Sequence, residues 1–326
     1  MKRCDIVEMF NEKDMVKVCA PMVRYSKLPF RMLVREYDTD VCFTPMIMSD
    51  SFVQSEKARD NEFKTCEDDR PLIVQFAANN VEDFLKAAEL VAPYADGVDL
   101  NCGCPQRWAM KEGYGSSLLK KPELIRDIVL RTRNTLPSPF SVSVKIRILD
   151  DLSETLSLCQ SLEAAGVSFL TVHARTPLQR RQPPNYEALQ LLCSSLNIPV
   201  VANGDLHSLQ IAQDIASDTG CKGVMTARGI LENPALYAGF ATTPVECVQR
   251  WFSLCLSLGS SFSCFHRHLS LMTGSSSVGV GNVNPGIIKN PMDRRFLNCL
   301  TTYPAVIDFF SREDIFGKEF LPLFQP

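Results

Sequence analysis

The chain has 326 residues and a net charge of −3, and 45% of its residues are hydrophobic and 22% charged. This composition is typical of a globular protein, and no apolar run reaches the roughly 18 residues that a membrane-spanning helix needs. Because the net charge is slightly negative, it provides no overall attraction to nucleic acid, and an RNA partner would need a local basic patch. We therefore expect a soluble protein without a membrane partner.

Cysteine usage indicates the compartment. The thirteen cysteines are odd in number and follow no disulfide framework, which is typical of reduced thiols inside the cell. Residues 1–18 interrupt each short apolar run with an acidic residue or a lysine, so they lack the apolar stretch of a secretory signal. We expect a cytoplasmic location, with the nucleus as the alternative.

Short apolar segments alternate with amphipathic stretches between Val16 and about Tyr237, a pattern that predicts repeated βα units. The apolar segments are rich in β-branched and aromatic residues, as strands covered on both faces are. The expected strands are 16–20, 41–44, 72–75, 97–100, 141–146, 169–173, 200–203 and 223–227. Between them, helical spacing predicts helices such as 80–92 and 152–165.

Eight parallel strands form either an open doubly wound sheet or a closed barrel, and periodicity does not separate the two. Polar side chains decide the question, because they fall at the C-terminal ends of many different strands. These residues are Gln75, Asn101, Lys145, His173 and Asn203. Barrel enzymes assemble their sites on this face. The sequence therefore predicts an α/β fold, a (β/α)8 TIM barrel over residues 1–240.

After about residue 241 the alternation stops and helical spacing takes over, over 245–258, 262–272 and 294–310. This predicts a small all-helical C-terminal domain, 241–326. Residues 273–291 are rich in Gly, Ser, Asn and Pro and lack periodicity, so we expect a loop that interrupts this domain.

Cys104 is the candidate catalytic residue. The expected strand from Gly97 runs into Asn101-Cys102-Gly103-Cys104-Pro105, where Gly103 permits a tight turn and Pro105 prevents a helix. A thiol with a pKa of about 8.5 is mostly protonated at neutral pH, so it can act as an acid or, after deprotonation, as a nucleophile. The alternative is that Cys102 and Cys104 are two buried core residues. Their C-x-C spacing, without a second ligand pair, argues against a metal site.

Lys145 and His173 are further candidates. A lysine at the end of an apolar strand is costly to bury unless it faces an anion or an electron-rich heterocycle. A lone histidine is more often a core residue, but His173 ends a predicted strand as Lys145 does, and this company favours a function. After the last two expected strands, Asn203-Gly204-Asp205 and Ala227-Arg228-Gly229 occupy the loops in which such barrels bind phosphate. No G-x-G-x-x-G follows a strand, so the sequence predicts no Rossmann nicotinamide domain.

Together these segments resemble the dihydrouridine synthase family, flavin enzymes that reduce the 5,6 double bond of uridines in tRNA. The resemblance covers most of the chain and rests on six motifs in order. They are 20–23 (APMV), 101–105 (NCGCP), 144–147 (VKIR), 172–175 (VHAR), 203–205 (NGD) and 227–229 (ARG) with 233–234 (NP). The chain is most similar to the eukaryotic branch that acts at the adjacent D-loop positions 20a and 20b.

The resemblance implies an FMN cofactor, NADPH as its reductant and Cys104 as the proton donor to uracil C5. The residues that it implies for FMN are Pro21, Met22, Gln75, Asn101, Lys145, His173, Asn203, Gly204, Asp205, Ala227, Arg228 and Gly229. The residues themselves agree with this chemistry, because reduction of a uracil ring needs a hydride at C6 and a proton at C5.

A uridine in folded tRNA must be unstacked to react, so a basic rim is expected around the site. Residues 106–147 contain nine Lys and Arg against three acidic residues, although solvated helix faces would look the same. The expected substrate-binding residues are Arg107, Arg175, Arg180 and Arg181. Residues 241–326 contain seven Lys and Arg against six acidic residues, which is little net positive charge for an RNA-binding domain.

Two alternatives remain at this stage. The first is a flavin barrel that acts on a free pyrimidine, against which stand the extra helices and the arginines between 175 and 181. The second is a tRNA-binding or structural protein that keeps the barrel without catalysis, against which stand Cys104, Lys145 and His173. The sequence leaves the oligomeric state open.

Overall fold

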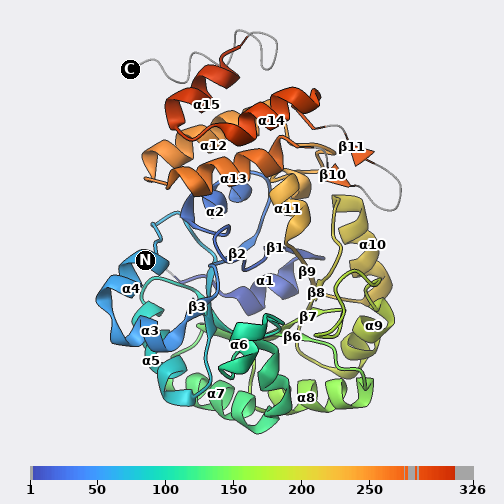
Figure 1. The fold of residues 1–326 in the computed structure, drawn as a ribbon. Coiled ribbons are helices and arrows are strands. Elements are labelled where there is room, and N and C mark those ends of the chain that lie inside the picture. The colour runs from blue at the N-terminus through green and yellow to red at the C-terminus, as the bar shows by residue number, and fades with distance from the viewer. Residues whose placement is uncertain (1–2, 275, 278–282, 285, 313–326) are drawn as a thin grey trace.

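A computed structural model describes residues 3–274, 276–277, 283–284 and 286–312 of the chain. Eight parallel strands form a closed barrel, which confirms the predicted (β/α)8 fold (Figure 1). The strands are β1 Val16–Cys19, β2 Val41–Phe43, β4 Leu72–Ala77, β5 Gly97–Cys102, β6 Ser141–Arg147, β7 Phe169–His173, β8 Val200–Asn203 and β9 Gly223–Thr226. The pairs β1–β9 and β2–β4 complete the ring.

Helices cover the outside and the ends of the barrel (Figure 1). They are α1 Ile6–Glu12, α2 Leu28–Arg35, α3 Ser49–Gln54, α4 Glu56–Glu62, α5 Val81–Val91, α6 Arg107–Lys111, α7 Pro122–Thr135, α8 Leu152–Ala164, α9 Tyr186–Ser195, α10 Leu209–Thr219 and α11 Arg228–Glu232, with two short 3-10 helices, η1 Gly115–Lys120 and η2 Leu236–Ala238. Polar side chains cap the N-termini of several helices. The first-turn amides of α5, α8, α9 and α10 donate hydrogen bonds to the side chains of Asn80, Asp151, Asn185 and Ser208. No helix among the described residues is long and apolar enough to span a membrane.

Two apolar layers hold the barrel together. One lies between the strands and the surrounding helices, and the other fills the barrel interior. In the interior layer Val18, Phe43 and Phe169 are buried, and Ile6 and Phe10 of α1 pack against them. The rings of Phe10 and Phe169 are 5.3 Å apart. Helix α1 therefore closes the N-terminal end of the barrel.

The C-terminal helices are α12 Val245–Ser257, α13 Phe262–Met272, α14 Pro291–Cys299 and α15 Tyr303–Phe310, and they lie together on the side of α2 (Figure 1). The prediction of one continuous helix over 294–310 is wrong. The helix ends at Cys299, and a new one starts at Tyr303, where the Thr302 side chain caps the Ala305 amide and Pro304 lies in the first turn. The expected domain boundary near residue 240 stays a prediction.

Two pairs of residues in the predicted loop 273–291 form short strands, β10 Ser276–Ser277 and β11 Val283–Asn284. Residues 275, 278–282 and 285 lie outside the described residues. A further short strand, β3 Ile47–Met48, pairs with the end of β4. It escaped the sequence analysis because two residues carry no periodicity.

His268 connects the C-terminal helices to the barrel. Its ring stacks on Phe30 of α2, with centroids 4.4 Å apart, and Trp251 of α12 lies beside it. Its Nε2 is 3.0 Å from the carbonyl oxygen of Tyr25. Burial lowers the pKa of His268 to about 3. The histidine is therefore neutral and part of an aromatic junction.

Candidate active site

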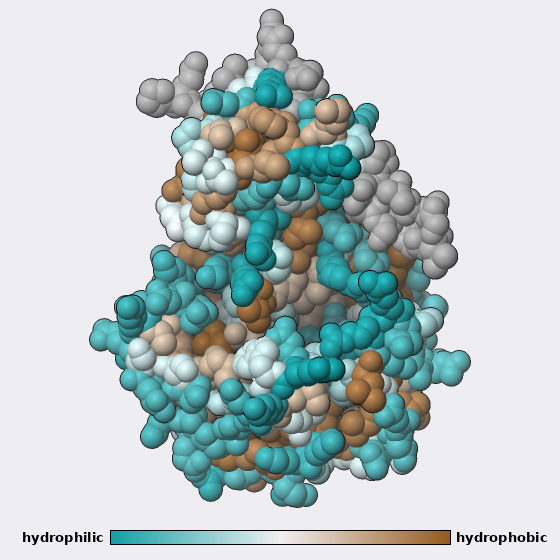
Figure 2. Space-filling model, in the orientation of Figure 1, coloured by the Kyte–Doolittle hydropathy of each residue, from teal (hydrophilic) through white to brown (hydrophobic). Residues whose placement is uncertain are grey.

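Five polar side chains from consecutive strands β4 to β8 lie together near the C-terminal end of the barrel. They are Gln75, Asn101, Lys145, His173 and Asn203, as the sequence predicted. Strand register places Asn101 opposite Lys145, and His173 opposite Asn203. Figure 2 shows a hollow on the face of the molecule in view, between the barrel and the C-terminal helices, with hydrophilic residues around its rim.

A chain of hydrogen bonds fixes the cysteine loop from inside the barrel. Gln75 donates from Nε2 to Asp99 Oδ2 (2.8 Å) and accepts from Asn101 Nδ2 (2.9 Å). Asn101 Oδ1 in turn accepts from the backbone amides of Cys104 (2.9 Å) and Gly103 (3.2 Å). Because an ionised carboxylate only accepts, Asp99 determines which way both amides face. The sequence analysis missed Asp99, whose signal was a charged residue within an apolar strand.

Burial dominates the electrostatics of Asp99 and Lys145. Burial raises the pKa of Asp99 to about 6, although hydrogen bonds from Ser143 and Gln75 and the charge of Lys145 act to lower it. Burial and the nearby Arg147 lower the pKa of Lys145 to about 8, against the opposing effect of Asp99. Lys145 Nζ donates to Asn203 Oδ1 (2.9 Å). The lysine is therefore mostly charged at neutral pH and close to losing its proton.

The two cysteines of the C-x-C segment differ in environment. Cys102 is fully buried, and burial raises the pKa of its thiol well above the usual value. Cys104 is partly exposed on the loop between β5 and α6. Arg147, which the sequence analysis did not select, donates from Nε to the Gly103 carbonyl (2.9 Å) and from Nη1 to Thr176 (3.0 Å). It ties the cysteine loop to the loop that follows β7.

A cavity of about 70 Å³ lies at the ends of β7, β8 and β9. The predicted residues that line it are His173, Arg175, Asn203, Gly204, Asp205, Ala227, Arg228 and Gly229. Gly204 has φ +140, and a side chain at Gly229 would collide with the Leu206 carbonyl, so glycine is required at both positions. His207 also lines the cavity, and its Nδ1 is buried without a partner among the described residues. The sequence analysis missed this histidine.

His173 carries no positive charge at neutral pH. Burial and the positive charges of Lys145 and Arg147 lower its pKa to about 2. The neutral ring can donate one hydrogen bond and accept another.

Arg175 and Asp205 form an ion pair beside the cavity. Arg175 is only 3% exposed, and its guanidinium pairs with the Asp205 carboxylate through two nitrogens, while Nε donates to the Gln182 carbonyl (2.5 Å). Arg228 donates to the same carboxylate (2.6 Å). Although burial acts to raise it, these arginines hold the pKa of Asp205 below its usual value. A direct ligand contact from Arg175 or Asp205 would require this cluster to rearrange.

The remaining predicted residues lie at the edge of the site. Pro21 and Met22 follow β1 and are half-buried, and the Met22 amide donates to Ser26 Oγ (2.9 Å). Arg107 on α6 and Arg180 and Arg181 after β7 are exposed. None of the three forms a salt bridge within the part of the chain that the structure describes.

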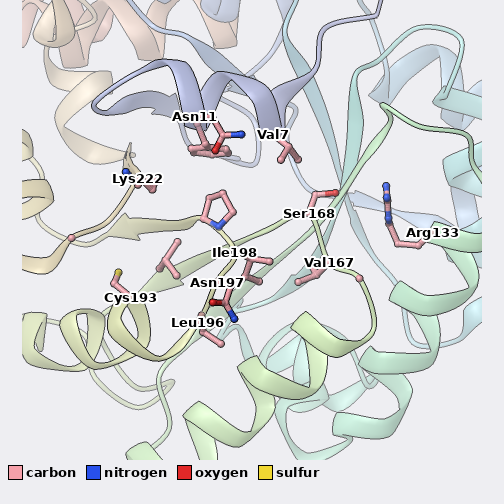
Figure 3. Close-up of a pocket in the computed structure, with 15 residues that line it drawn as sticks. Val7, Asn11, Arg133, Val167, Ser168, Cys193, Leu196, Asn197, Ile198 and Lys222 are labelled. Atoms are coloured by element: carbon pink, nitrogen blue, oxygen red, sulfur yellow. The ribbon is translucent and has the colours of Figure 1, made fainter.

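A second cavity, of about 450 Å³, lies at the opposite end of the barrel (Figure 3). It is bordered by Val7 and Asn11 of α1 and by Ser168 and Lys222, which precede β7 and β9. Barrel enzymes carry their chemistry at the C-terminal face, so this cavity is not the candidate active site. Among the described residues, no group of three or more His, Cys, Asp and Glu could hold a metal ion.

The fold and the site together define a (β/α)8-barrel enzyme in which a thiol, a lysine and a neutral histidine surround the mouth beside a small glycine-lined cavity. Residues 18–284 match the sequence profile of the family described as dihydrouridine synthase. The chain belongs to the dihydrouridine synthase family.

Known relatives match most or nearly all of the chain. A mouse protein named as an NAD(P)+ tRNA-dihydrouridine(20a/20b) synthase-like protein is 50% identical over 98% of this chain and 95% of its own length. The tRNA-dihydrouridine(20a/20b) synthase of Schizosaccharomyces pombe is 47% identical over 82% of each chain. The old yellow enzyme of Trypanosoma cruzi has a TM-score of 0.50 at 10% identity, over 68% of this chain and 86% of its own. That likeness supports the barrel fold alone.

Proposed function

We propose that this protein is an FMN- and NADPH-dependent tRNA-dihydrouridine synthase, located in the cytoplasm or nucleus, that reduces uridines at D-loop positions 20a and 20b. The observation that carries the proposal is the 50% identity, over almost the full length of both chains, to a mouse protein named as an NAD(P)+ tRNA-dihydrouridine(20a/20b) synthase-like protein. The placement of Cys104 at the mouth of the barrel supports it.

The donor set of the site fits a flavin mononucleotide. The glycine-lined cavity, with Arg228 and the unpartnered Nδ1 of His207 in its wall, suits a phosphate group. Gln75, Asn101, Lys145 and His173 would face the polar atoms of the flavin ring and its side chain. Pro21 and Met22 would lie along the ring. Lys145 is mostly charged at neutral pH, so it favours an electron-rich heterocycle beside it.

The reaction adds a hydride to C6 and a proton to C5 of uracil. When bound, the flavin supplies the hydride after reduction by NADPH. Cys104 donates the proton, because its thiol is partly exposed on the loop after β5, at the mouth where a uracil would enter. Asn101 and Arg147 hold the cysteine loop through the backbone of residues 103 and 104. The exposed Arg107, Arg180 and Arg181 would contact the RNA, whereas Arg175 would hold the loop after β7 through its ion pair with Asp205.

The test of Cys104 is dihydrouridine formation in tRNA by wild-type protein and Cys104→Ala. General acid catalysis contributes about 10²- to 10⁴-fold, so we expect a rate loss of at least about 100-fold. Cys299, which is exposed on α14, provides the matched control, and Cys299→Ala should retain full activity. Equal rates for Cys104→Ala and wild type would remove Cys104 as the acid. No dihydrouridine from the wild type, in any tRNA, would overturn the proposed function.

The test of the cofactor is reconstitution. Purified protein should show flavin absorbance near 450 nm after addition of FMN, and Arg228→Ala should weaken FMN binding more than riboflavin binding, because only FMN carries the phosphate. Protein that binds neither compound would contradict a flavoenzyme. Reduction of free uridine at a rate comparable to tRNA would favour an enzyme that acts on free pyrimidines.

A further inference from the structure

Trp108 is an unusual surface residue. It lies on α6, four residues after Cys104, and 47% of it is exposed. Its indole nitrogen donates to Gln106 Oε1, so the ring is oriented by its own neighbour. Neither face of the indole contacts another ring among the described residues. The other tryptophan, Trp251, is fully buried.

An apolar groove of about 450 Å³ adjoins the indole. Its lining includes Val23, Met46 and Met48, and Val23 is 49% exposed. Met46 and Met48 also pack in the small apolar cluster that contains Cys104. The groove is therefore continuous with the surroundings of the candidate catalytic thiol.

Two exposed arginines lie beside residues of the groove lining. Arg24 and Arg107 are exposed next to Val23 and Trp108, and neither forms a salt bridge among the described residues. Glu62 is the single charged residue in the lining, and Glu56 and Asp60 on the same helix are also exposed. Cations that flank an exposed aromatic ring and an apolar groove are the combination that binds single-stranded nucleic acid, with the base on the ring and the phosphate on the cation.

We propose that Trp108 and this groove bind the base of a nucleotide adjacent to the reacting uridine, by stacking on the indole. This inference rests on the proposed function, in which the two target positions are neighbours in the D-loop. While one uridine lies against Cys104, the groove holds the next base of the same strand. Dihydrouracil is not planar, so an already reduced neighbour stacks less well, and the groove thereby favours one order of modification.

The experiment combines a protein variant with an RNA variant. Wild type, Trp108→Ala and Trp108→Phe are assayed with intact tRNA and with tRNAs that carry an abasic residue at position 20b or at position 20, while the uridine at 20a reacts. Loss of one base-stacking contact weakens binding by about 5- to 150-fold, so Trp108→Ala should reduce kcat/KM on intact tRNA by that factor. Trp108→Phe should lose much less. On the tRNA that lacks the stacked base, wild type and Trp108→Ala should be equal.

Tyr94 provides the matched control, because it is a 56% exposed aromatic residue on the connection before β5, at the other end of the barrel. Tyr94→Ala should leave kcat/KM unchanged on every tRNA. The stacking proposal is overturned if Trp108→Ala loses the same activity on intact tRNA and on both abasic tRNAs, or if it loses none. In either case, dihydrouridine formation by the wild type would still support the proposed function.

Tryptophan fluorescence tests the contact between Trp108 and tRNA even if the protein forms no dihydrouridine. Because Trp251 is buried, iodide quenches mainly Trp108. Intact tRNA should protect this emission from iodide, and one of the two abasic tRNAs should protect it less. Binding of tRNA without any protection of Trp108 would contradict the proposal.

Discussion

At the residue scale, the buried charge of Asp99 costs stability in the ligand-free protein. Its pKa of about 6 lies above the ordinary value of 3.8, so the folded state binds a proton more tightly than the unfolded state. The carboxylate therefore lowers stability at any pH above about 6, and this cost disappears as the pH falls towards 4. A pKa difference of one unit corresponds to about 1.4 kcal/mol.

Asp99→Asn should stabilise the ligand-free protein at pH 7.5 by on the order of 2 kcal/mol, because the amide removes the charge and still accepts from Gln75. The gain should shrink towards pH 4. Urea unfolding at the two pH values measures this gain, and Asp218→Asn, at an exposed position on α10, is the control. An equal gain at both pH values would show that the charge is not the cause.

The sequence located the residues at strand ends but not their partners. Gln75, Asn101 and Lys145 were predictable because strand ends in a barrel converge. The pairing of Arg175 with Asp205 joins residues 30 positions apart, and their contact depends on two loops whose conformations no pattern describes. Asp99 and His207 were missed for the same reason, since their roles arise only from neighbouring strands and loops.

At the element scale, α2 is anchored by a buried ion pair. Arg31 is 1% exposed and donates to Asp69 from Nε (3.0 Å) and Nη2 (2.6 Å), and also to the carbonyls of Ser26 and Lys64. Arg35 makes a second, more exposed contact with Asp69. The pair ties α2 to the chain that enters β4.

Arg31→Met should lower the free energy of unfolding by about 3–5 kcal/mol, because it leaves the Asp69 carboxylate buried without its main partner. Arg35→Met should cost clearly less, since Arg31 remains in place. Denaturant unfolding of both variants provides the measurement. If the two substitutions cost the same, the stabilising partner of Asp69 is not the buried arginine.

Strands were the elements that the sequence predicted best. All eight barrel strands lie within two residues of their expected bounds, because each is a short apolar run between polar turns. The failed helix 294–310 shows the limit of periodicity. Its apolar spacing continues across residues 300–302, and only the Thr302 cap and Pro304 indicate that the backbone turns there.

At the scale of the whole molecule, His268 makes the attachment of the C-terminal helices sensitive to acid. Its pKa of about 3 lies below the ordinary 6.5, so between these values the unfolded state binds more protons than the folded state. Stability is therefore lost as the pH falls from 6.5 towards 3, by at most about 1.4 kcal/mol per pH unit for this one group.

His268→Phe should reduce this pH dependence while keeping the stack on Phe30 and Trp251. The difference between the thermal midpoints at pH 6.5 and pH 4.5 should be smaller in the variant than in wild type. Some dependence will remain, because the low pKa of His173 acts in the same direction. A variant with the same pH dependence as wild type would contradict the assignment.

Closure of the barrel was predictable from the sequence, whereas the contact of the barrel with the C-terminal helices was not. Polar residues at many strand ends favoured a ring over an open sheet, and the β1–β9 pair confirms it. The junction around His268 joins residues more than 200 positions apart, and a single histidine within an amphipathic helix gave no sign of it.

The plug formed by α1 has a kinetic consequence. With Ile6 and Phe10 sealing one end of the barrel, every ligand must arrive and depart through the other. We expect a nicotinamide and a flipped-out uridine, which would share this entrance, to use it in turn. Double-reciprocal plots of initial rate against tRNA, at several NADPH concentrations, should therefore be parallel, as for a ping-pong enzyme. Intersecting lines would mean that both ligands are held at once.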